Sequence, residues 1–255
     1  MDDLNSDSLQ HLINKIPFIA WSDFLDKTES TNDDALTYLK SGRKENGIIV
    51  ANYQISGKGR LNRAWESPKP GQDILMSLIV QPAVPISSWP RISFPLSLAI
   101  RQALVEYVPS HLPVQLKWPN DILINQQKCV GILIDAHPES NRIILGIGIN
   151  VNQVMLDNDR TSLAQVNGVS ISRYEVLEDI LNAIQATLNS ILYAKIDTTE
   201  WQSNAAFLNQ LVAFNIQNYQ YVGLFKGITE KGDLIIEQNN KNNVFTNAYH
   251  FRLFD

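Results

Sequence analysis

Short segments rich in Val, Ile and Leu, each bounded by turn residues, recur through the first 150 residues of the chain. Such segments are typical of strands. We expect strands at residues 24–27, 48–54, 74–81, 114–117, 122–125, 130–135 and 142–149. Helical patterns at residues 32–40 and 89–108 interrupt the series. The irregular alternation predicts a mixed α+β layer in which helices cover a sheet.

In the second half of the chain the pattern becomes helical and then, from residue 211, becomes typical of strands. Ser172 and Glu175 have the spacing of a capping box, and apolar residues follow at helical spacing as far as Ile191 and Leu192. A second helix is expected near residues 199–208. From residue 211 onward, short strands predict a small all-β barrel of about 45 residues. These strands are expected at residues 212–217, 219–229, 234–238 and 244–253.

The patterns divide the chain into three parts. Residues 1–22 form an extension with one short amphipathic helix, residues 23–210 form the α+β domain, and residues 211–255 form the barrel. The extension is too short for a winged helix-turn-helix. No basic leader or apolar run of about 18 residues is present, so we expect neither a secretory signal nor a membrane span.

Composition limits the partners that this chain can take. It has 255 residues, 44% of them hydrophobic and 18% charged, as in ordinary globular proteins. The formal net charge of −5 gives no overall attraction for nucleic acid or an anionic membrane, so any phosphate must be bound locally. The single cysteine, Cys129, excludes an intramolecular disulfide and a zinc ribbon, and suits the reducing cytoplasm.

Residues 54–65 concentrate positive charge in this acidic chain. The glycines of this loop let the backbone approach an anion, and its cations can neutralise phosphate oxygens. Its candidate site residues are Gln54, Gly57, Lys58, Gly59, Arg60, Arg63 and Trp65, the last offering a flat face to a purine. A solvated basic hairpin is the alternative, but it does not explain why the cations cluster. Gly-Lys-Ser/Thr is absent, which excludes a Walker P-loop.

Two polar segments lie at the ends of expected secondary structure. Ser30, Thr31 and Asn32 open a helix, and Asp33 follows Ser30 at capping-box spacing. A helix N-terminus of this kind can cap itself, hold a polar ligand group, or do both. Residues 117–121, Lys-Trp-Pro-Asn-Asp, join two strands. They are either a turn with its Trp in the core or a site where an amide and a carboxylate meet magnesium or phosphate.

Glycines interrupt two of the expected strands. Gly131, three residues after Lys128, indicates a bulge or a close approach of another group. Gly146 begins a Gly-Ile-Gly-Ile-Asn run that lacks the third glycine and the helix of a dinucleotide motif, so its glycines are better explained as space for an apolar ligand. Asn150 could donate to an oxygen or a base. The strand at residues 146–151 could be an interior strand or a dimer edge.

Five segments, in this order and spacing, resemble biotin protein ligase: residues 30–32, 54–65, 117–121, 128–131 and 146–152. With the barrel, the resemblance extends from about residue 24 to residue 253. It implies a class II aminoacyl-tRNA synthetase-like catalytic domain of the biotin/lipoate ligase type, in which helices flank a mixed sheet. A small Src-homology-3-like barrel would follow. It also implies the monofunctional type, without an N-terminal DNA-binding domain.

The resemblance implies a role for each matching position. Biotin would be contacted by Ser30, Thr31, Asn32, Gln54, Gly57, Lys58, Gly59, Arg60, Lys128, Gly131 and Gly146. ATP would be contacted by Arg60, Arg63, Trp65, Asn120, Lys128 and Asn150. Arg60 and Lys128 would be catalytic, and Asp121 would orient or deprotonate the incoming lysine. The ligands of a metal are not assigned.

The implied reaction has two steps. With ATP and magnesium, the biotin carboxylate attacks the α-phosphate and gives biotinyl-5′-AMP and diphosphate. A lysine of a biotin carboxyl carrier protein, part of a carboxylase, then displaces AMP. We expect a cytoplasmic monomer or homodimer that binds neither DNA nor membrane. The alternatives are a lipoate or octanoate ligase or transferase of the same fold, a biotin-responsive repressor, and a non-catalytic biotin-binding module.

Two departures from the family pattern affect these expectations. Lys58 stands where arginine is commoner, which keeps the charge but loses the bidentate fork. The last strand lacks the usual Gly-Glu, so a contact between the barrel and ATP would depend on Arg252 alone. Because an acyl-adenylate hydrolyses readily, we also expect the loop of residues 56–62 to be mobile until ligand binds.

Overall fold

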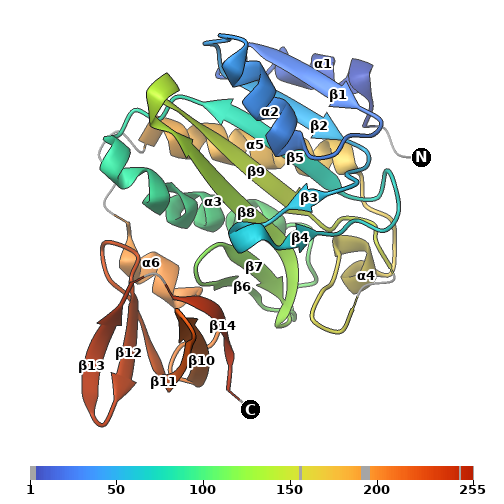
Figure 1. The fold of residues 1–255 in the computed structure, drawn as a ribbon. Coiled ribbons are helices and arrows are strands. Elements are labelled where there is room, and N and C mark those ends of the chain that lie inside the picture. Colours follow the sequence, from blue (N-terminus) through green and yellow to red (C-terminus); the bar gives the residue numbers. More distant parts are fainter. Residues whose placement is uncertain (1–3, 155–156, 191–195, 247, 255) are drawn as a thin grey trace.

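A seven-stranded sheet organises the larger part of the protein (Figure 1). The computed structural model describes residues 4–154, 157–190, 196–246 and 248–254. The strand order is β1-β2-β5-β9-β8-β7-β6, and every neighbouring pair is antiparallel except β1 and β2. The strands are β1 (Trp21–Leu25), β2 (Gly47–Ala51), β5 (Ile74–Val80), β6 (Val114–Lys117), β7 (Asp121–Ile124), β8 (Gln127–His137) and β9 (Arg142–Ile149). The expected mixed α+β layer is therefore confirmed.

Helices cover the two faces of this sheet unequally. On one face lie α1 (Ser6–Ile13), α3 (Ser93–Val105) and α5 (Arg173–Ser190). On the other, α2 (Thr31–Lys40) packs over β2, β5 and β9, where Ala35 meets Ile49, Ile79 and Ile144, and its Tyr38 contacts Trp21 of β1. Next to α2, the short hairpin of β3 (Gly57–Lys58) and β4 (Ala64–Trp65) crosses in front of β8 and β9 (Figure 1). The sheet is thus left partly open beneath this hairpin.

The other differences from expectation are local, and one of them is that the helix expected near residues 199–208 ends at Ser203. The helix expected at residues 89–108 begins as a 3-10 turn, Ile86–Ile92, that contains Pro90 and leads into α3. The short helix α4 (Leu163–Asn167) was not predicted. α5 is capped as predicted, with Ser172 Oγ accepting from Glu175 N at 3.2 Å, whereas Ile191 and Leu192 lie outside the described residues.

The C-terminal strands form a five-stranded antiparallel sheet with the order β13-β12-β11-β10-β14. They are β10 (Leu211–Ile216), β11 (Tyr219–Ile228), β12 (Leu234–Gln238), β13 (Lys241–Phe245) and β14 (Tyr249–Leu253). The prediction of one strand at 244–253 is wrong, because β13 turns back on β12 through Asn239 and Asn240 while β14 crosses over to pair with β10. Residue 247, between the two strands, lies outside the described residues. We call β10–β14 the barrel.

Aromatic packing holds the barrel against the larger sheet. Trp118, which follows β6, donates from Nε1 to Gly232 O at 2.8 Å and packs against Phe251 with 6.0 Å between ring centroids. The chain reaches the barrel through α6 (Thr198–Ser203), after which Ala206 N donates to Leu116 O at 2.8 Å and extends the edge of the sheet. One continuous apolar core joins the two parts.

The sheet topology decides one point that the sequence left open. β9 lies between β5 and β8, so the strand containing Gly146 is interior, and the two edges of the large sheet are β1 and β6. Within the described ranges, no helix combines the length and apolar composition that a membrane crossing requires.

Candidate functional site

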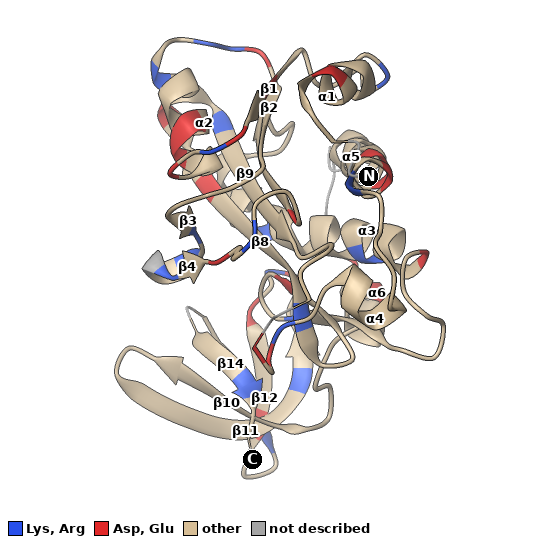
Figure 2. Ribbon diagram, turned by 90° about the vertical axis from the view of Figure 1, so that its right-hand side faces the viewer, with Lys and Arg blue, Asp and Glu red and all other residues tan. Residues whose placement is uncertain are grey.

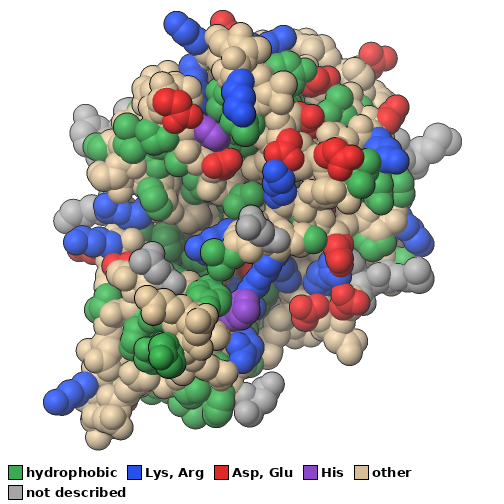
Figure 3. All heavy atoms as spheres, viewed as in Figure 1, with side chains coloured by type: hydrophobic (Ala, Val, Ile, Leu, Met, Phe, Trp, Pro, Cys, Tyr) green, Lys and Arg blue, Asp and Glu red, His purple; other side chains and the backbone are tan. Residues whose placement is uncertain are grey.

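A cleft of about 990 Å³, its open mouth included, lies over the uncovered face of the sheet. The β3–β4 hairpin, the turn between β6 and β7, and β14 of the barrel enclose it. Figure 3 shows Lys and Arg side chains and a histidine gathered where the barrel meets the rest of the molecule. The cleft brings together most of the predicted site residues: Thr31, Asn32, Gln54, Lys58, Gly59, Arg60, Arg63, Trp65, Asn120, Asp121, Lys128, Gly131 and Gly146.

The N-terminus of α2 forms a neutral, polar end of the cleft. Ser30 is the N-cap residue, but its side chain makes no capping bond, so the predicted capping box with Asp33 is wrong. Gln54 replaces it: its Oε1 accepts from Thr31 N at 2.8 Å and from Thr31 Oγ1 at 3.0 Å. The buried hydroxyl of Ser77 on β5 lies 2.8 Å from Thr31 Oγ1 and 2.7 Å from Asn32 Oδ1.

Buried polar atoms at this end of the cleft have no protein partner. Ser30 Oγ, Asn32 Nδ2 and Trp65 Nε1 are buried, and none has a hydrogen-bond partner among the described residues. Leaving such a group unsatisfied costs about 1–3 kcal/mol. Two of these residues, Asn32 and Trp65, line the cleft, where a bound ligand can supply the missing partner.

Glycines on the sheet make room for the side chains above them. A Cβ at Gly146 would lie 2.3 Å from Asn32 Oδ1, so this strand position must lack a side chain. Cβ atoms at Gly148 and Gly131, which pair across β9 and β8, would lie 2.4 and 2.7 Å from the indole of Trp65. The prediction that Gly131 marks a close approach is confirmed, and the approaching group is Trp65.

The opposite end of the cleft is cationic. Lys128 Nζ is ion-paired with Asp121 Oδ1 at 2.7 Å and lies 5.3 Å from the centre of the Trp65 ring. Arg60 Nη1 reaches Asn120 Oδ1 at 3.5 Å. Lys117, at the end of β6, joins them, and burial lowers the pKa of its ammonium although Asp121 opposes the effect.

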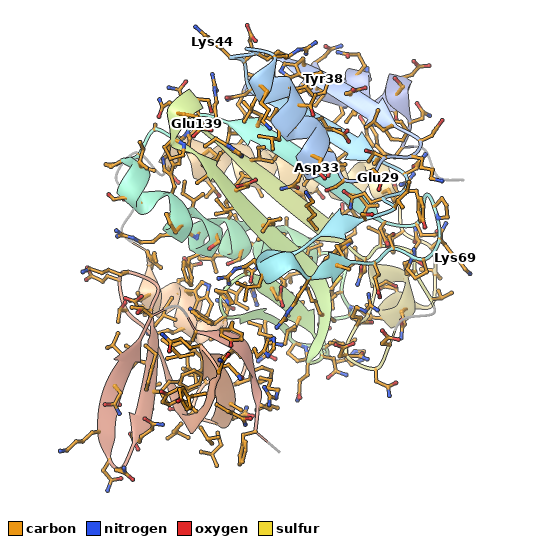
Figure 4. All side chains as sticks on the ribbon, in the orientation of Figure 1. Glu29, Asp33, Tyr38, Lys44, Lys69 and Glu139 are labelled. Atoms are coloured by element: carbon orange, nitrogen blue, oxygen red, sulfur yellow. The ribbon has the colours of Figure 1, made fainter. Side chains whose placement is uncertain are left out.

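The β3–β4 hairpin supplies the remaining charges. Figure 2 shows Lys and Arg on this hairpin, which projects over the open face of the sheet. Lys58 Nζ is bound to Asp33 Oδ1 of α2, and both side chains remain about half exposed. Ser56 Oγ, just before β3, donates to Glu29 Oε2 at 3.1 Å. Glu29 and Asp33 both lie near the start of α2 (Figure 4), so the hairpin is tied to that helix.

Three predicted residues do not line the cleft. Ser30 is buried behind its wall, and a Cβ at Gly57 would lie 2.5 Å from Trp65 O, so this glycine lets the hairpin close. Asn150 is 2% exposed, and its Nδ2 donates to Thr161 O at 3.0 Å and to Lys128 O at 3.4 Å. These hydrogen bonds hold Asn150 against the segment that follows β9. Its buried position outside the cleft lining gives no support to an ATP contact.

Sequence reasoning missed several residues of the cleft. Ser77 does not line the cleft itself but supports Thr31 and Asn32 from below; it is the one polar residue of the buried strand β5, a signal that was available. Lys117 and Gly148 lie inside motifs that were noticed, although neither residue was assigned a role. The barrel contributes Tyr249, His250 and Phe251 rather than Arg252, which corrects the expectation for β14.

The described residues contain no group of three or more His, Cys, Asp or Glu side chains that could hold a metal ion. A divalent cation bound here could be held by the side-chain oxygens of Asp121 and Asn120. Oxygen atoms of a substrate would have to complete its coordination. The arrangement as a whole places a neutral, hydrogen-bonding pocket beside a cluster of five cations. It can bring two anionic groups together and lower the barrier to their reaction.

Comparisons with known proteins agree with this geometry. Residues 23–152 match the Biotin/lipoate A/B protein ligase family. The chain is 32% identical over 241 residues to the bifunctional ligase/repressor BirA of Bacillus subtilis, covering 90% of this chain and 70% of that protein. It is 28% identical over 224 residues to the biotin–[acetyl-CoA-carboxylase] ligase of Mycobacterium tuberculosis, covering 84% of this chain and 82% of that protein.

A solved structure matches over nearly the same length. Biotin protein ligase from Aquifex aeolicus, in complex with biotin and ATP, superposes with a TM-score of 0.76 at 27% identity. The match covers 92% of this chain and 99% of that one. The larger sheet with its flanking helices and the C-terminal β domain, consistent with a Src-homology-3-like fold, are therefore both shared. The chain belongs to the biotin/lipoate A/B protein ligase family.

Proposed function

We propose that this protein is an ATP-dependent ligase that adenylates biotin and transfers it to a lysine of a biotin carboxyl carrier protein. One observation carries the proposal: Asn32 Nδ2 and Trp65 Nε1, buried and without a hydrogen-bond partner among the described residues, belong to residues that line a cleft shared with five cations. The neutral pocket fits the uncharged head group of biotin, and the cations fit its carboxylate and the phosphates of ATP. The similarity to biotin ligases of other organisms supports the same assignment.

The residues of the neutral end would bind biotin. Thr31 and Asn32, with Gln54 from the loop after β2, offer donors and acceptors to the head group, Ser30 lies behind them, and Gly146 makes room for Asn32. Because α2 and β5 are held by hydrogen bonds and core packing, this pocket is formed before a ligand arrives. Preformed donors select a ligand by shape and hydrogen-bond geometry rather than by charge.

The residues of the cationic end would perform the first step. Arg60 and Lys128 bring the biotin carboxylate and the α-phosphate together, and Arg63 with Lys117 offers charge to the leaving diphosphate. The backbone of Gly57, Lys58 and Gly59, in the hairpin, would contact the same carboxylate and phosphate groups. Magnesium, held by the phosphates with Asp121 or Asn120, would neutralise charge on the triphosphate. Trp65, whose ring centre lies 5.3 Å from Lys128 Nζ, would contact ATP at this end.

Several finer statements belong to the same proposal. The cytoplasm fits an enzyme that consumes ATP and whose one thiol, Cys129, is reduced and buried. The negative net charge argues against a DNA partner. The division at residues 210/211 coincides with the beginning of β10, whereas the division at 22/23 falls inside β1. β1 and β6 are the edge strands of the described sheet, and the protein could be a monomer or a homodimer.

Biotin-dependent exchange between labelled diphosphate and ATP tests the proposal. With magnesium present, we expect exchange with biotin and at least 100-fold less with lipoate or octanoate, since a site built to hydrogen-bond a polar head group discriminates strongly against a ligand that lacks it. Exchange with lipoate or octanoate instead would place the protein with the lipoate enzymes. No exchange with any acid would favour a binding module. Either result contradicts the proposal.

A further inference from the structure

Strand β14 of the barrel presents a histidine to the cleft. Its register with β10 pairs Ala213 with Arg252 and Asn215 with Tyr249, so three steps along β14 match two along β10. This one-residue bulge contains His250, whose φ of 55° is in the left-handed region that residues other than glycine rarely adopt. Bulges of this kind redirect side chains next to active sites. His250 is exposed, and it lines the cleft.

Neighbouring aromatic residues fix the bulge in place. Phe251 is buried and packs edge-on against Trp118, at 6.0 Å, and Phe225, at 5.0 Å. The ring of Tyr249 lies edge-on to the His250 ring at 4.9 Å, and its hydroxyl donates to Gln217 O. Since Trp118 lies three residues before Asp121 in the chain, the packing that holds β14 also sets it relative to the cationic end of the cleft.

The proposed transfer step needs a proton acceptor. The carrier lysine arrives as an ammonium, with an ordinary pKa near 10.4, so only about one molecule in 10³ is nucleophilic at neutral pH. Among the described lining residues, Asp121 is the one carboxylate, and it is already paired with Lys128. The other titratable or charged groups around the cleft are Lys58, Arg60, Arg63, Lys117 and the phenol of Tyr249. An imidazole has a free lone pair in its neutral form and is the ordinary base at this pH.

We propose that His250 is the general base of the transfer step, an inference that rests on the proposed function. Its imidazole nitrogen takes one proton from the lysine ammonium. The freed amine forms the C–N bond with the carbonyl carbon of biotin, and the C–O bond to the phosphate breaks with its electron pair leaving on AMP. The second proton on nitrogen passes to water, as does the proton held by the imidazolium. No oxidant or further reactant is needed.

Single-turnover transfer tests this role. The enzyme is loaded with biotin, ATP and magnesium, freed of excess ligand, and mixed with a biotin carboxyl carrier domain between pH 5.5 and 9.5. For the wild type we expect the rate to rise with pH and then to level off, as it does when a neutral imidazole acts as the base. For His250→Gln we expect a loss of about 100-fold at pH 7 and a rate that keeps rising to pH 9.5. His111→Gln, an exposed histidine outside the cleft, should match the wild type.

A second variant separates chemistry from folding. His250→Gly relieves the left-handed backbone, and its slow transfer should be restored at least tenfold by added imidazole, which a purely structural role would not produce. The proposal is overturned if His250→Gln transfers at a reduced rate with the wild-type pH profile, if it transfers as fast as the wild type, or if imidazole has no effect on His250→Gly. If the wild type itself forms no adenylate, the proposed function fails first.

Discussion

Two buried polar clusters of this protein are built on opposite principles. In the first, at the beginning of β5, Asp73 accepts from Val151 N at 3.1 Å, from Gln153 Nε2 at 3.2 Å and from Ser67 Oγ, while Arg173 donates to Asp73 O at 3.0 Å. In the second, at the start of α2, two buried polar atoms, Ser30 Oγ and Asn32 Nδ2, have no partner among the described residues. We call these the Asp73 cluster and the cleft wall.

The two clusters are expected to affect different properties of the protein: the Asp73 cluster its stability, and the cleft wall its function. A buried polar group that is bonded within the chain contributes to folding, whereas one that is left unbonded costs free energy until a ligand satisfies it. Changes in the cleft wall and its cations should therefore alter catalysis while leaving unfolding nearly unaffected. Changes in the Asp73 cluster should do the reverse.

Removal of Lys128 should have the largest effect. Lys128→Met deletes the ammonium that pairs with Asp121 and faces the cleft, so biotin-dependent exchange should fall about 1000-fold, or roughly 4 kcal/mol. The unfolding midpoint in urea should change little, because Lys128 is partly exposed. Lys15→Met, which breaks the distant ion pair with Glu178, is the matched control and should keep full exchange. Equal losses in both variants would contradict the assignment.

The Asp73 cluster should make stability depend on pH. Burial raises the pKa of Asp73 to about 6 despite its hydrogen bonds, above the ordinary value near 4. Between pH 4 and 6 the folded state holds a proton that the unfolded state has released, so stability falls as pH rises, by at most about 3 kcal/mol. Urea unfolding of the wild type and Asp73→Asn at pH 4 and 7.5 should show the wild type losing that much relative to the variant. A pH-independent difference would refute the prediction.

Loss of one hydroxyl in the cleft wall should weaken biotin binding. Thr31→Val keeps the shape of the side chain but removes the group that donates to Gln54 and faces Ser77. We expect the KM for biotin to rise about tenfold, with kcat changed less than threefold. Thr37→Val, on the exposed part of the same helix, should leave the KM at its wild-type value. A KM that does not change in Thr31→Val would remove this residue from the pocket.

The exposed pair of Lys58 and Asp33 should matter least. Because both side chains are about half exposed, Lys58→Ala should reduce kcat/KM less than about fivefold. Lys58→Arg should restore it or exceed the wild type, since the guanidinium fork binds phosphate and carboxylate oxygens in pairs. Steady-state kinetics at two salt concentrations would measure both. A loss of 100-fold in Lys58→Ala would show that this lysine acts with Lys128 and not as a screened surface charge.

Local patterns predicted most of the fold. The apolar strands of the large sheet, the capped helix after Ser172 and the change to short strands near residue 211 are all present, because burial and capping leave short-range signals. The split of residues 244–253 into two strands was missed. Alternation alone does not show that β14 leaves β13 to pair with β10, a contact between residues far apart in the chain.

The site was predicted where chemistry and spacing agreed. Charged and glycine-rich motifs marked most of the cleft, whereas long-range contacts decided the exceptions. Gln54 takes the capping role expected of Ser30, and the backbone of Lys128 and Thr161 takes the amide of Asn150. Neither of these hydrogen-bond partners can be predicted from the sequence, since each contact joins residues that are brought together by the sheet. His250 was overlooked because its exposure to the cleft comes from a bulge.

Direct detection of the intermediate tests the central claim. The purified wild type is incubated with biotin, ATP and magnesium, separated from free ligand, denatured, and analysed by mass spectrometry beside Lys128→Met. The account predicts biotinyl-5′-AMP bound to the wild type in near-equimolar amount, and little in the variant over the same time. If the wild type instead retains unmodified biotin while ATP remains intact, the cleft binds biotin without activating it, and the account is contradicted.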